Sequence, residues 1–282
     1  MYNKNMPTQP FLSVVIPAYN EEKRITGTLL AIDKYVNSKR FKEILRAQNY
    51  LRDGEGYEIL VVSDGSKDGT ARVVEKFTTL IRNLRLVANA QNHGKGYVVR
   101  QGMLEAKGLY RLFTDADNAT PIEEVEKLLP YIKGIEWQGG GVAKDVGVYD
   151  VSIGSIGLKE SAVGKAEPLL RVMLGKMSNW LIQIVAVWGI HDTQRGFKLF
   201  TAEAARNVFS RLKIDRWAFD IEALAVSRKL KYRIKEVPIT WFHDPDSRVT
   251  AGAYIKTLFE LFKIKWLLIT GAHFRQKGEK LT

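Results

Sequence analysis

The feature that most constrains the fold is a series of four apolar segments, each followed by a stretch with helical periodicity. The apolar segments are 11–17, 57–64, 84–89 and 109–114, and the first two are rich in β-branched residues. Alternation of strands and helices at this spacing is typical of βαβ units, which build parallel sheets. We therefore predict an α/β fold with a mostly parallel central sheet and flanking helices.

The rest of the chain continues this pattern less regularly. Residues 37–56 are predicted as a polar connecting excursion. Residues 134–147 contain five glycines and are predicted as a loop, either an active-site lid or only an irregular connection. We expect one domain over residues 1–250, followed by a basic amphipathic helix within residues 251–282. Helices are predicted at 21–36, 69–83, 94–108, 121–132, 160–190, 201–211, 217–229 and 252–272, and further strands at 150–155, 195–200 and 231–242.

Composition limits the classes of function. The chain lacks cysteine, which excludes disulfides and thiolate metal sites. The net charge is +12, and residues 228–282 hold 12 Lys and Arg against 5 Asp and Glu. A basic terminus suits phosphorylated substrates, anionic lipid or nucleic acid, but no nucleic-acid motif is recognised, so we expect no nucleic-acid partner. The longest uncharged apolar run, 180–190, is too short to span a bilayer.

Two aspartates, Asp115 and Asp117, follow the fourth predicted strand and are separated only by Ala116. Parallel sheets bind ligands in the crevice beyond the carboxyl ends of their strands, where both carboxylates are expected. Two neighbouring carboxylates repel unless a cation lies beside them, and hard oxygen ligands suit Mg²⁺ or Mn²⁺. The pattern predicts a divalent metal site, and the alternative is a helix cap beside a solvated aspartate.

Polar residues after the other strands complete a candidate nucleotide site. Asp64 ends the second strand, where its carboxylate either accepts from an N–H of a base or serves only a turn. Asn20 and Glu22 follow the first strand and are placed to hydrogen-bond a nucleoside. Lys95 lies between two glycines at a helix start, where the ammonium and the helix N-terminus favour a phosphate. The sequence signatures of P-loops and standard dinucleotide sites are absent.

Several motifs resemble family 2 of the inverting glycosyltransferases, which have the GT-A fold. The matching stretches are "VVIPAYNEE", "VVSDGSKDGT", "NHGKGYVVRQGM" and "FTDADNATP". Three later stretches, "GIHDTQRGFKLF", "RWAFDIEAL" and "KEVPITWFHDPDSRV", are similar to the dolichyl-phosphate β-glucosyltransferase branch, which is close to the dolichyl-phosphate mannosyltransferases. The resemblance covers residues 11–250 and implies a Rossmann-like domain that binds a nucleotide diphosphate sugar.

The resemblance also implies roles for individual residues. Asp115 and Asp117 would hold Mg²⁺ or Mn²⁺ on the donor diphosphate. The implied reaction moves a hexose, with glucose favoured, from a nucleotide diphosphate sugar, with UDP-glucose favoured, to a polyprenyl or dolichyl phosphate. The alternatives are a soluble or peripheral family 2 enzyme that glycosylates a glycan hydroxyl, and a non-catalytic nucleotide-sugar-binding module. The residues assigned to the nucleotide sugar are Pro17, Ala18, Asn20, Glu22, Asp64, Lys95, Asp115, Ala116, Asp117 and Gln194.

The acceptor decides which side chains the chemistry needs. A sugar hydroxyl needs a general base, whereas a lipid phosphate is already anionic and needs a cation to position it. Arg195, Lys198 and Arg248 are the candidate cations. Asp192 and Asp220 are the candidate bases or orienting carboxylates, and for each the alternative is a cap or a buried ion pair with an arginine. We assign Asp192, Asp220, Arg195 and Arg248 to the catalytic group.

The terminal helix offers a surface for a lipid acceptor. Its apolar side chains recur at helical spacing, whereas Lys256 and Lys263 lie off that stripe. A basic amphipathic helix with Trp and Phe is typical of an interfacial anchor, and the alternative is a helix that closes the core. We expect a cytoplasmic protein that is peripherally associated with the cytoplasmic face of a membrane. The stripe consists of Ile255, Leu258, Phe259, Phe262, Trp266 and Ile269.

Overall fold

The computed structural model describes residues 9–50, 56–136, 145–163, 180–242 and 251–274, and of residues 251–255 only the backbone. Within this part of the chain, seven strands form a sheet in the order β3-β2-β1-β4-β7-β5-β8, and β6 pairs with β9 separately. The strands are β1 Leu12–Ala18, β2 Tyr57–Asp64, β3 Leu84–Asn89, β4 Tyr110–Thr114, β5 Val151–Ser155, β6 Ala162–Val163, β7 Phe197–Thr201, β8 Ile234–Pro238 and β9 Thr240–Trp241.

One strand of the main sheet runs against the others. β1 pairs in parallel with β2 and with β4, and β2 pairs in parallel with β3. β7 is antiparallel to both of its neighbours, β4 and β5, while β5 pairs in parallel with β8. The predicted mostly parallel sheet is therefore confirmed, and the beginning of β7 lies beside the end of β4.

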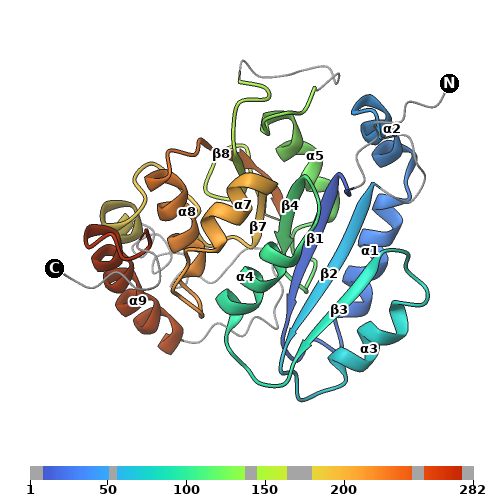
Figure 1. The fold of residues 1–282 in the computed structure, drawn as a ribbon, viewed down its shortest axis with the longest axis horizontal. Helices are drawn as coiled ribbons and strands as arrows, with labels where there is room; N and C mark the ends of the chain where they lie inside the picture. The colour runs from blue at the N-terminus through green and yellow to red at the C-terminus, as the bar shows by residue number, and fades with distance from the viewer. Residues whose placement is uncertain (1–8, 51–55, 137–144, 164–179, 243–250, 275–282) are drawn as a thin grey trace.

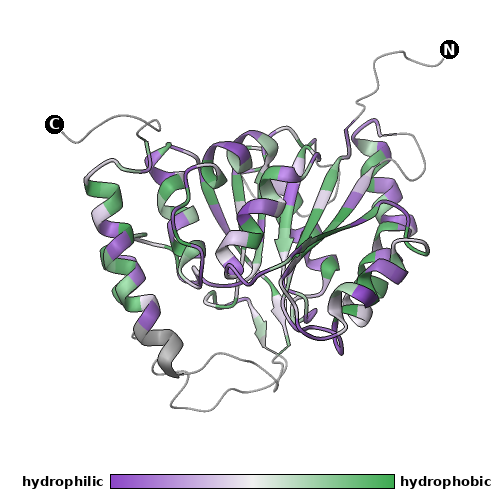
Figure 2. Ribbon diagram, turned by 60° about the horizontal axis from the view of Figure 1, so that its bottom comes forward, coloured by the Kyte–Doolittle hydropathy of each residue, from purple (hydrophilic) through white to green (hydrophobic). Residues whose placement is uncertain are grey.

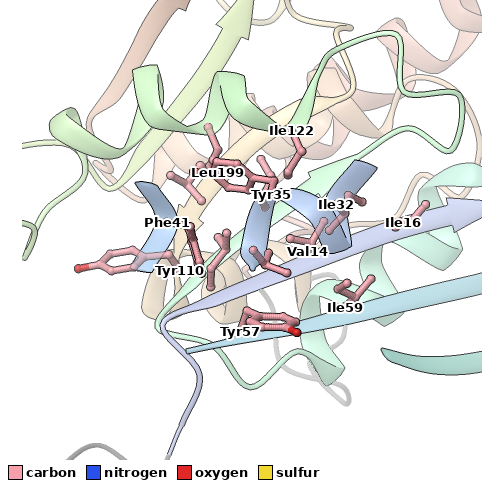
Figure 3. Close-up of a cluster of buried hydrophobic side chains, with 14 of the residues drawn as sticks. Val14, Ile16, Ile32, Tyr35, Phe41, Tyr57, Ile59, Tyr110, Ile122 and Leu199 are labelled. Carbon is pink, nitrogen blue, oxygen red and sulfur yellow. The ribbon is translucent and has the colours of Figure 1, made fainter. Parts of the chain in front are cut away.

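Helices cover both faces of the sheet (Figure 1). The described helices are α1 Ile25–Val36, α2 Lys39–Ala47, α3 Thr70–Phe77, α4 Lys95–Glu105, α5 Val125–Leu128, α7 Ala202–Phe209, α8 Phe219–Lys229 and α9 Ala251–Ile269, with 3₁₀ turns η1 Ile122–Glu124 and η2 Leu129–Tyr131. Alternate residues of β1 point to opposite faces, so Val14 packs with α1 and α2, whereas Val15 packs with α4, α7 and α8. Figure 3 shows the first of these clusters, with Tyr35 and Phe41 among its side chains.

The polar excursion predicted for residues 37–56 contains a helix, α2, that the sequence analysis did not place there. Ser38 caps it by accepting a hydrogen bond from Phe41 N at 3.1 Å. Phe41, Ile44 and Leu45 are buried at the spacing i, i+3 and i+4, which is the core-facing stripe of an amphipathic helix. Only these three apolar positions mark the helix among charged residues, so the polar composition of the segment is misleading.

Two other predicted elements are divided in the structure. The helix expected over 121–132 consists of η1, the four-residue α5 and η2, and Pro130 lies in the last of these turns. The strand expected over 231–242 ends at Pro238, and its continuation, β9, pairs with β6 instead of joining the main sheet. Of the helical region expected over 160–190, residues 180–185 are helical, and residues 164–179 lie outside the described part.

The terminal helix α9 packs against α8 at one end of the molecule (Figure 1). Leu261 of α9 is buried in the same cluster as the side chains of α8. Ala218 N donates to Glu260 Oε2 at 2.9 Å, and His273 Nε2 lies 2.7 Å from Glu222 Oε1. The helix is thus fastened to the core by apolar and polar contacts. Among the described helices, none is both long enough and apolar enough to cross a membrane.

Candidate active site

The ends of β1, β2 and β4 meet at one edge of the sheet because these neighbouring strands are parallel (Figure 1). Pro17 and Ala18 of β1 lie opposite Val62 and Ser63 of β2, so the two strand ends are level. β4 ends directly before Asp115. Side chains that follow these three strands therefore share the crevice in which parallel sheets bind ligands.

The two aspartates after β4 form a partly buried acidic pair. Asp115 Oδ1 lies 2.6 Å from Nζ of Lys95. Asp117 Oδ1 accepts a hydrogen bond from Ala119 N at 3.0 Å. Burial, and then the neighbouring charge of Asp115, raise the pKa of Asp117. The positive charges of Lys95 and Arg24 offset only part of this rise.

The chemistry of this pair fits a divalent metal. Ala116 O accepts from Thr28 Oγ1 at 2.6 Å, which fixes the backbone between the two carboxylates. Asp115 and Asp117 offer hard oxygen donors, and a cation would offset both the burial and the repulsion that raise the pKa of Asp117. The described residues contain no group of three His, Asp or Glu that could enclose a metal ion. Two protein carboxylates suit Mg²⁺ or Mn²⁺, which keep waters and take further ligands from substrate phosphates.

Lys95, the first residue of α4, faces the acidic pair. Gly94 precedes it with a φ of 107°, and a Cβ at this position would collide with the carbonyl oxygen of Asp215, so glycine is required here. Burial opposes the charged form of Lys95, but attraction to Asp115 and to Asp220 outweighs it and raises the pKa of Lys95. A charged ammonium at a helix N-terminus is well placed for a phosphate group.

Asp64 holds the loop that leads to Lys95. Its Oδ1 accepts from His93 N at 2.7 Å, and its Oδ2 accepts from Asn92 Nδ2 and from Gly94 N, both at 2.9 Å. The side chain is buried at the end of β2. In this structure both carboxylate oxygens serve the loop, and the contact of Asp64 with a nucleotide base stays a prediction.

Asn20 and Glu22 tie the segment after β1 to the segment after β2. Asn20 Oδ1 accepts from Lys67 N at 2.8 Å, and Asn20 N donates to Ser66 Oγ at 3.1 Å. Glu22 Oε2 accepts from Gly69 N at 2.9 Å. These bonds shape the edge of the candidate site, while the predicted contacts of Asn20 and Glu22 with a nucleoside stay predictions.

A second group of polar residues lies on the segment before β7. Asp192 Oδ2 accepts from Ile156 N at 3.1 Å and pairs with Arg195 Nε at 3.3 Å. Asp192 N in turn donates to Glu236 Oε1 of β8 at 2.8 Å. The guanidinium of Arg195 lies 4.4 Å from the centre of the Trp241 ring. Arg195 is thus held by a carboxylate and an aromatic ring.

Asp220, the other candidate base, is buried and paired. Its Oδ1 lies 2.7 Å from Nζ of Lys198, whose side chain is fully buried in β7. Burial raises the pKa of Asp220, and attraction to Lys198 and Lys95 offsets part of that rise. The ion-pair alternative therefore describes Asp220 here, with a lysine as partner instead of an arginine. Lys198 is fully buried and paired with Asp220, which argues against its predicted contact with an acceptor phosphate.

The segment before β7 lies against Asp115, but the structure does not bring every predicted site residue to the acidic pair. A Cβ on Gly196 would collide with the carboxyl group of Asp115, so this backbone lies directly against that side chain. Gln194, two residues earlier, is exposed. Arg248 lies outside the described residues, and its assignment stays a prediction.

Two further residues of this region, Glu236 and Trp241, were not predicted from the sequence. Glu236 accepts from the backbone N–H groups of both His191 and Asp192, at 2.8 to 3.1 Å, and so fixes the segment before β7. A glutamate inside the apolar run "KEVPITW" was an available signal for a carboxylate with an internal partner. Trp241 gave no such signal, because tryptophan in a strand usually indicates core packing.

The fold and the acidic pair together define a class, the GT-A glycosyltransferases. Residues 13–136 match the family described as Glycosyl transferase family 2. Glucosyl-3-phosphoglycerate synthase from Mycobacterium tuberculosis, solved with Mn²⁺, UDP-glucose and phosphoglyceric acid, is similar with a TM-score of 0.62, 16% identity, and coverage of 97% of this chain and 83% of its own. Mannosyl-3-phosphoglycerate synthase from Rubrobacter xylanophilus is similar with a TM-score of 0.59, 15% identity, and coverage of 96% and 79%. These likenesses support the fold.

Curated relatives narrow the class. Several curated proteins with sequences similar to this chain are dolichyl-phosphate beta-glucosyltransferases. One from Trichomonas vaginalis is 36% identical, and the match covers 92% of this chain and 72% of the relative. The protein from Dictyostelium discoideum is 34% identical over 95% and 78%, and the human protein is 32% identical over 96% and 79%. The chain belongs to the dolichyl-phosphate beta-glucosyltransferase family. The predicted family, enzyme class and GT-A fold are thereby confirmed.

Proposed function

We propose that this protein transfers glucose from UDP-glucose to dolichyl phosphate or a related polyprenyl phosphate, with inversion at the anomeric carbon. The observation that carries the proposal is the pair Asp115 and Asp117 beside Lys95 at the carboxyl edge of β1, β2 and β4. The similar curated proteins are named dolichyl-phosphate beta-glucosyltransferases. The similar mycobacterial enzyme is solved with UDP-glucose and Mn²⁺, which supports the same donor and metal here.

On the donor side, Asp115 and Asp117 are proposed to hold Mg²⁺ or Mn²⁺, which when bound neutralises charge on the donor diphosphate. Lys95 adds a positive charge where the diphosphate accumulates negative charge as it leaves. Asp64 keeps the loop before Lys95 in place, since it accepts three hydrogen bonds from that loop. Pro17, Ala18, Asn20 and Glu22, with Ala116 and Gln194, stay assigned to the rest of the nucleotide sugar.

On the acceptor side, a phosphate oxygen of the lipid attacks the anomeric carbon from the face opposite the diphosphate. The bond from that carbon to the β-phosphate oxygen breaks, and UDP leaves with the electron pair. The attacking phosphate is ionised at neutral pH, so the reaction needs a cation to position it and no general base. Arg195, held by Asp192 and Trp241, is the described candidate for that cation, and Arg248 is a second.

The rival acceptor, a glycan hydroxyl, would require a carboxylate that is free to take a proton. Asp220 is buried against Lys198, and Asp192 accepts from Ile156 N and pairs with Arg195. Both candidate bases are therefore engaged, which favours an acceptor that is already anionic. A non-catalytic binding module is less well supported, because the acidic pair and Lys95 are all in place.

We further propose that the protein works as a peripheral protein on the cytoplasmic face of a membrane. Helix α9 exposes large apolar side chains, and the segment 180–188 adds others. Figure 2 shows the ribbon of α9 at one edge of the molecule, with hydrophobic residues interspersed with hydrophilic ones. Ile182 and Leu261, one from each segment, belong to the same buried hydrophobic cluster. Lys256 and Lys263 are exposed on α9 and suit anionic headgroups. This apolar surface consists of Trp180, Ile184, Trp188, Phe259, Phe262, Trp266 and Ile269.

Incubation with radiolabelled UDP-glucose, Mn²⁺ and dolichyl phosphate in mixed micelles tests the proposed reaction. Label is expected in the organic-soluble lipid fraction, with release of one UDP per glucose transferred. GDP-mannose and a soluble glycan acceptor, supplied in parallel, test the rival donor and acceptor. Transfer to the glycan but not to the lipid would refute the proposed acceptor, and donor binding without transfer to either would support a binding module.

A further inference from the structure

A lysine that is completely removed from solvent lies in the middle of β7. Lys198 is 0% exposed, and its neighbours in the strand, Phe197 and Leu199, belong to the core. Its ammonium lies 5.3 Å from the centre of the Phe113 ring and donates to the carbonyl oxygen of Arg195. A buried charge costs several kcal/mol of desolvation, and well-packed apolar residues often stabilise a core as well or better. Core stability alone therefore gives no reason for a lysine here.

The partner of Lys198 connects it to the candidate site. Asp220 lies in the first turn of α8, where a helix N-terminus favours a negative charge. It is 3% exposed, pairs with Lys198 at 2.7 Å and attracts the ammonium of Lys95. Lys95 in turn lies 2.6 Å from Asp115. Lys198, Asp220, Lys95 and Asp115 thus form a series of alternating positive and negative charges between the sheet interior and the acidic pair.

The backbones that carry Lys95 and Asp220 are packed closely together. A Cβ on Gly96 of α4 would collide with Phe219 of α8, which means that the starts of these two helices touch. Tyr97 N donates to Asp215 O at 3.0 Å and joins α4 to the segment before α8. The Lys95 ammonium itself lies 2.6 Å from Asp115 and 5.8 Å from the centre of the Trp217 ring, and it is also attracted by Asp220.

We propose that Lys198 is a positioning residue: by pairing with Asp220 it holds a fixed negative charge behind Lys95 and so sets where the Lys95 ammonium lies relative to Asp115 and the donor diphosphate. Without that charge, Lys95 is attracted by Asp115 and Asp117 alone and occupies the position that the divalent ion needs. The inference rests on the proposed function, since it concerns the binding of the nucleotide and its metal. It assigns to Asp220 a positioning role in place of the general-base role.

The double variant Lys198→Met/Asp220→Asn tests this proposal. Methionine has nearly the length of lysine and asparagine the shape of aspartate, and the two changes leave no unpaired buried charge. The variant is expected to unfold within a few degrees of the parent, because the substitution of a buried ion pair by neutral residues is often close to neutral. Calorimetry is expected to show UDP affinity in the presence of Mn²⁺ reduced about tenfold or more, the effect of one charge-assisted contact. Mn²⁺ alone, followed by electron paramagnetic resonance, should also bind more weakly.

Two comparisons separate positioning from a purely structural effect. The charge-matched control Arg85→Met/Glu105→Gln removes an ion pair of 2.9 Å between β3 and α4, away from the acidic pair, and should leave UDP affinity unchanged. In a Lys95→Met background, the Lys198→Met/Asp220→Asn change should cause no further loss of UDP affinity, because the residue that it positions is gone. Independent losses that add together would overturn the proposal.

The single variant Lys198→Met gives a prediction in the opposite direction, and it is expected to be less stable than the double variant because it leaves Asp220 buried without Lys198. Asp220 then has Lys95 as its remaining ammonium partner and draws it away from Asp115, so the affinity of the free enzyme for Mn²⁺ should rise. Parent-like UDP and Mn²⁺ affinities in both the single and the double variant would overturn the proposal. Failure of the proposed function is a different result, in which the parent protein binds no nucleotide at all.

Discussion

The loop before α4 depends on Asp64, and Asp64→Ala is expected to loosen it. Asp64 is 2% exposed and accepts hydrogen bonds from Asn92, His93 and Gly94. Asn92 and His93 are exposed and can recover water as a partner, whereas Gly94 is buried and its N–H is left unsatisfied. Hydrogen bonds to a charged group contribute about 1.5–3 kcal/mol, and an unsatisfied buried group costs about 1–3 kcal/mol. The free energy of unfolding should therefore fall by roughly 3 kcal/mol.

Urea unfolding followed by circular dichroism measures this loss, and calorimetry measures the effect on UDP. UDP should bind more weakly because Lys95 loses its fixed loop, while binding should still require Mn²⁺ because the acidic pair is untouched. Asp33→Ala is the control: Asp33 accepts from Asn37 at an exposed position on α1, and its loss should cost less than about 0.5 kcal/mol. A loss below about 1 kcal/mol in Asp64→Ala, with unchanged UDP affinity, would refute the anchoring role.

Asp117→Asn should abolish Mn²⁺-dependent UDP binding yet raise stability at neutral pH. The raised pKa of Asp117 means that its ionisation opposes folding, so the penalty grows as pH rises above the ordinary carboxyl pKa; urea titrations at pH 4 and pH 7 would show a gain only at the higher pH. Serine at Phe262 and Trp266 should release the protein from anionic vesicles, whereas Leu80→Ser, on a residue 75% exposed outside the apolar surface, should not. Arg248→Ala should raise the KM for dolichyl phosphate about tenfold with UDP affinity unchanged, and unaltered transfer kinetics would remove Arg248 from the acceptor site.

The donor half of the fold could be predicted from sequence because its information is local. Each apolar segment and the polar residue that ends it are adjacent in the chain, and parallel pairing places those ends together without further knowledge. This is why Asp64 and Asp115 could be assigned to one crevice. The helix α2 was not predicted, because its three buried side chains are recognisable as a core-facing stripe only once the distant residues that they contact are known.

Charge pairing was harder to predict because the partners are distant in sequence. Asp220 pairs with Lys198, 22 residues earlier, and Asp192 N donates to Glu236, 44 residues later. No window of neighbouring residues indicates which carboxylate pairs with which cation. The sequence therefore predicts Asp220 as a candidate base or orienting carboxylate, with a cap or a buried ion pair as the alternative, and Lys198 as a candidate cation for the acceptor. The lysine in "GFKLF" did carry one clue, since a charge inside an apolar strand requires an internal partner.

Because β7 is antiparallel to its neighbours, the candidate site residues fall into two consecutive blocks of the chain. The polar site residues of the first block lie at the carboxyl ends of strands β1 to β4. Asp192 and Arg195 instead lie on the segment that precedes β7. The residues proposed for the metal and the diphosphate therefore lie before residue 120, and the acceptor candidates lie after residue 190. Gln194, which is assigned to the nucleotide sugar, also belongs to the later block, and Gly196 lies against Asp115. Under the proposed function, changes in the segment before β7 should therefore alter the accepted substrate more than they alter nucleotide binding. In such a scaffold, acceptor preference can change while the residues that follow β1, β2 and β4 stay the same.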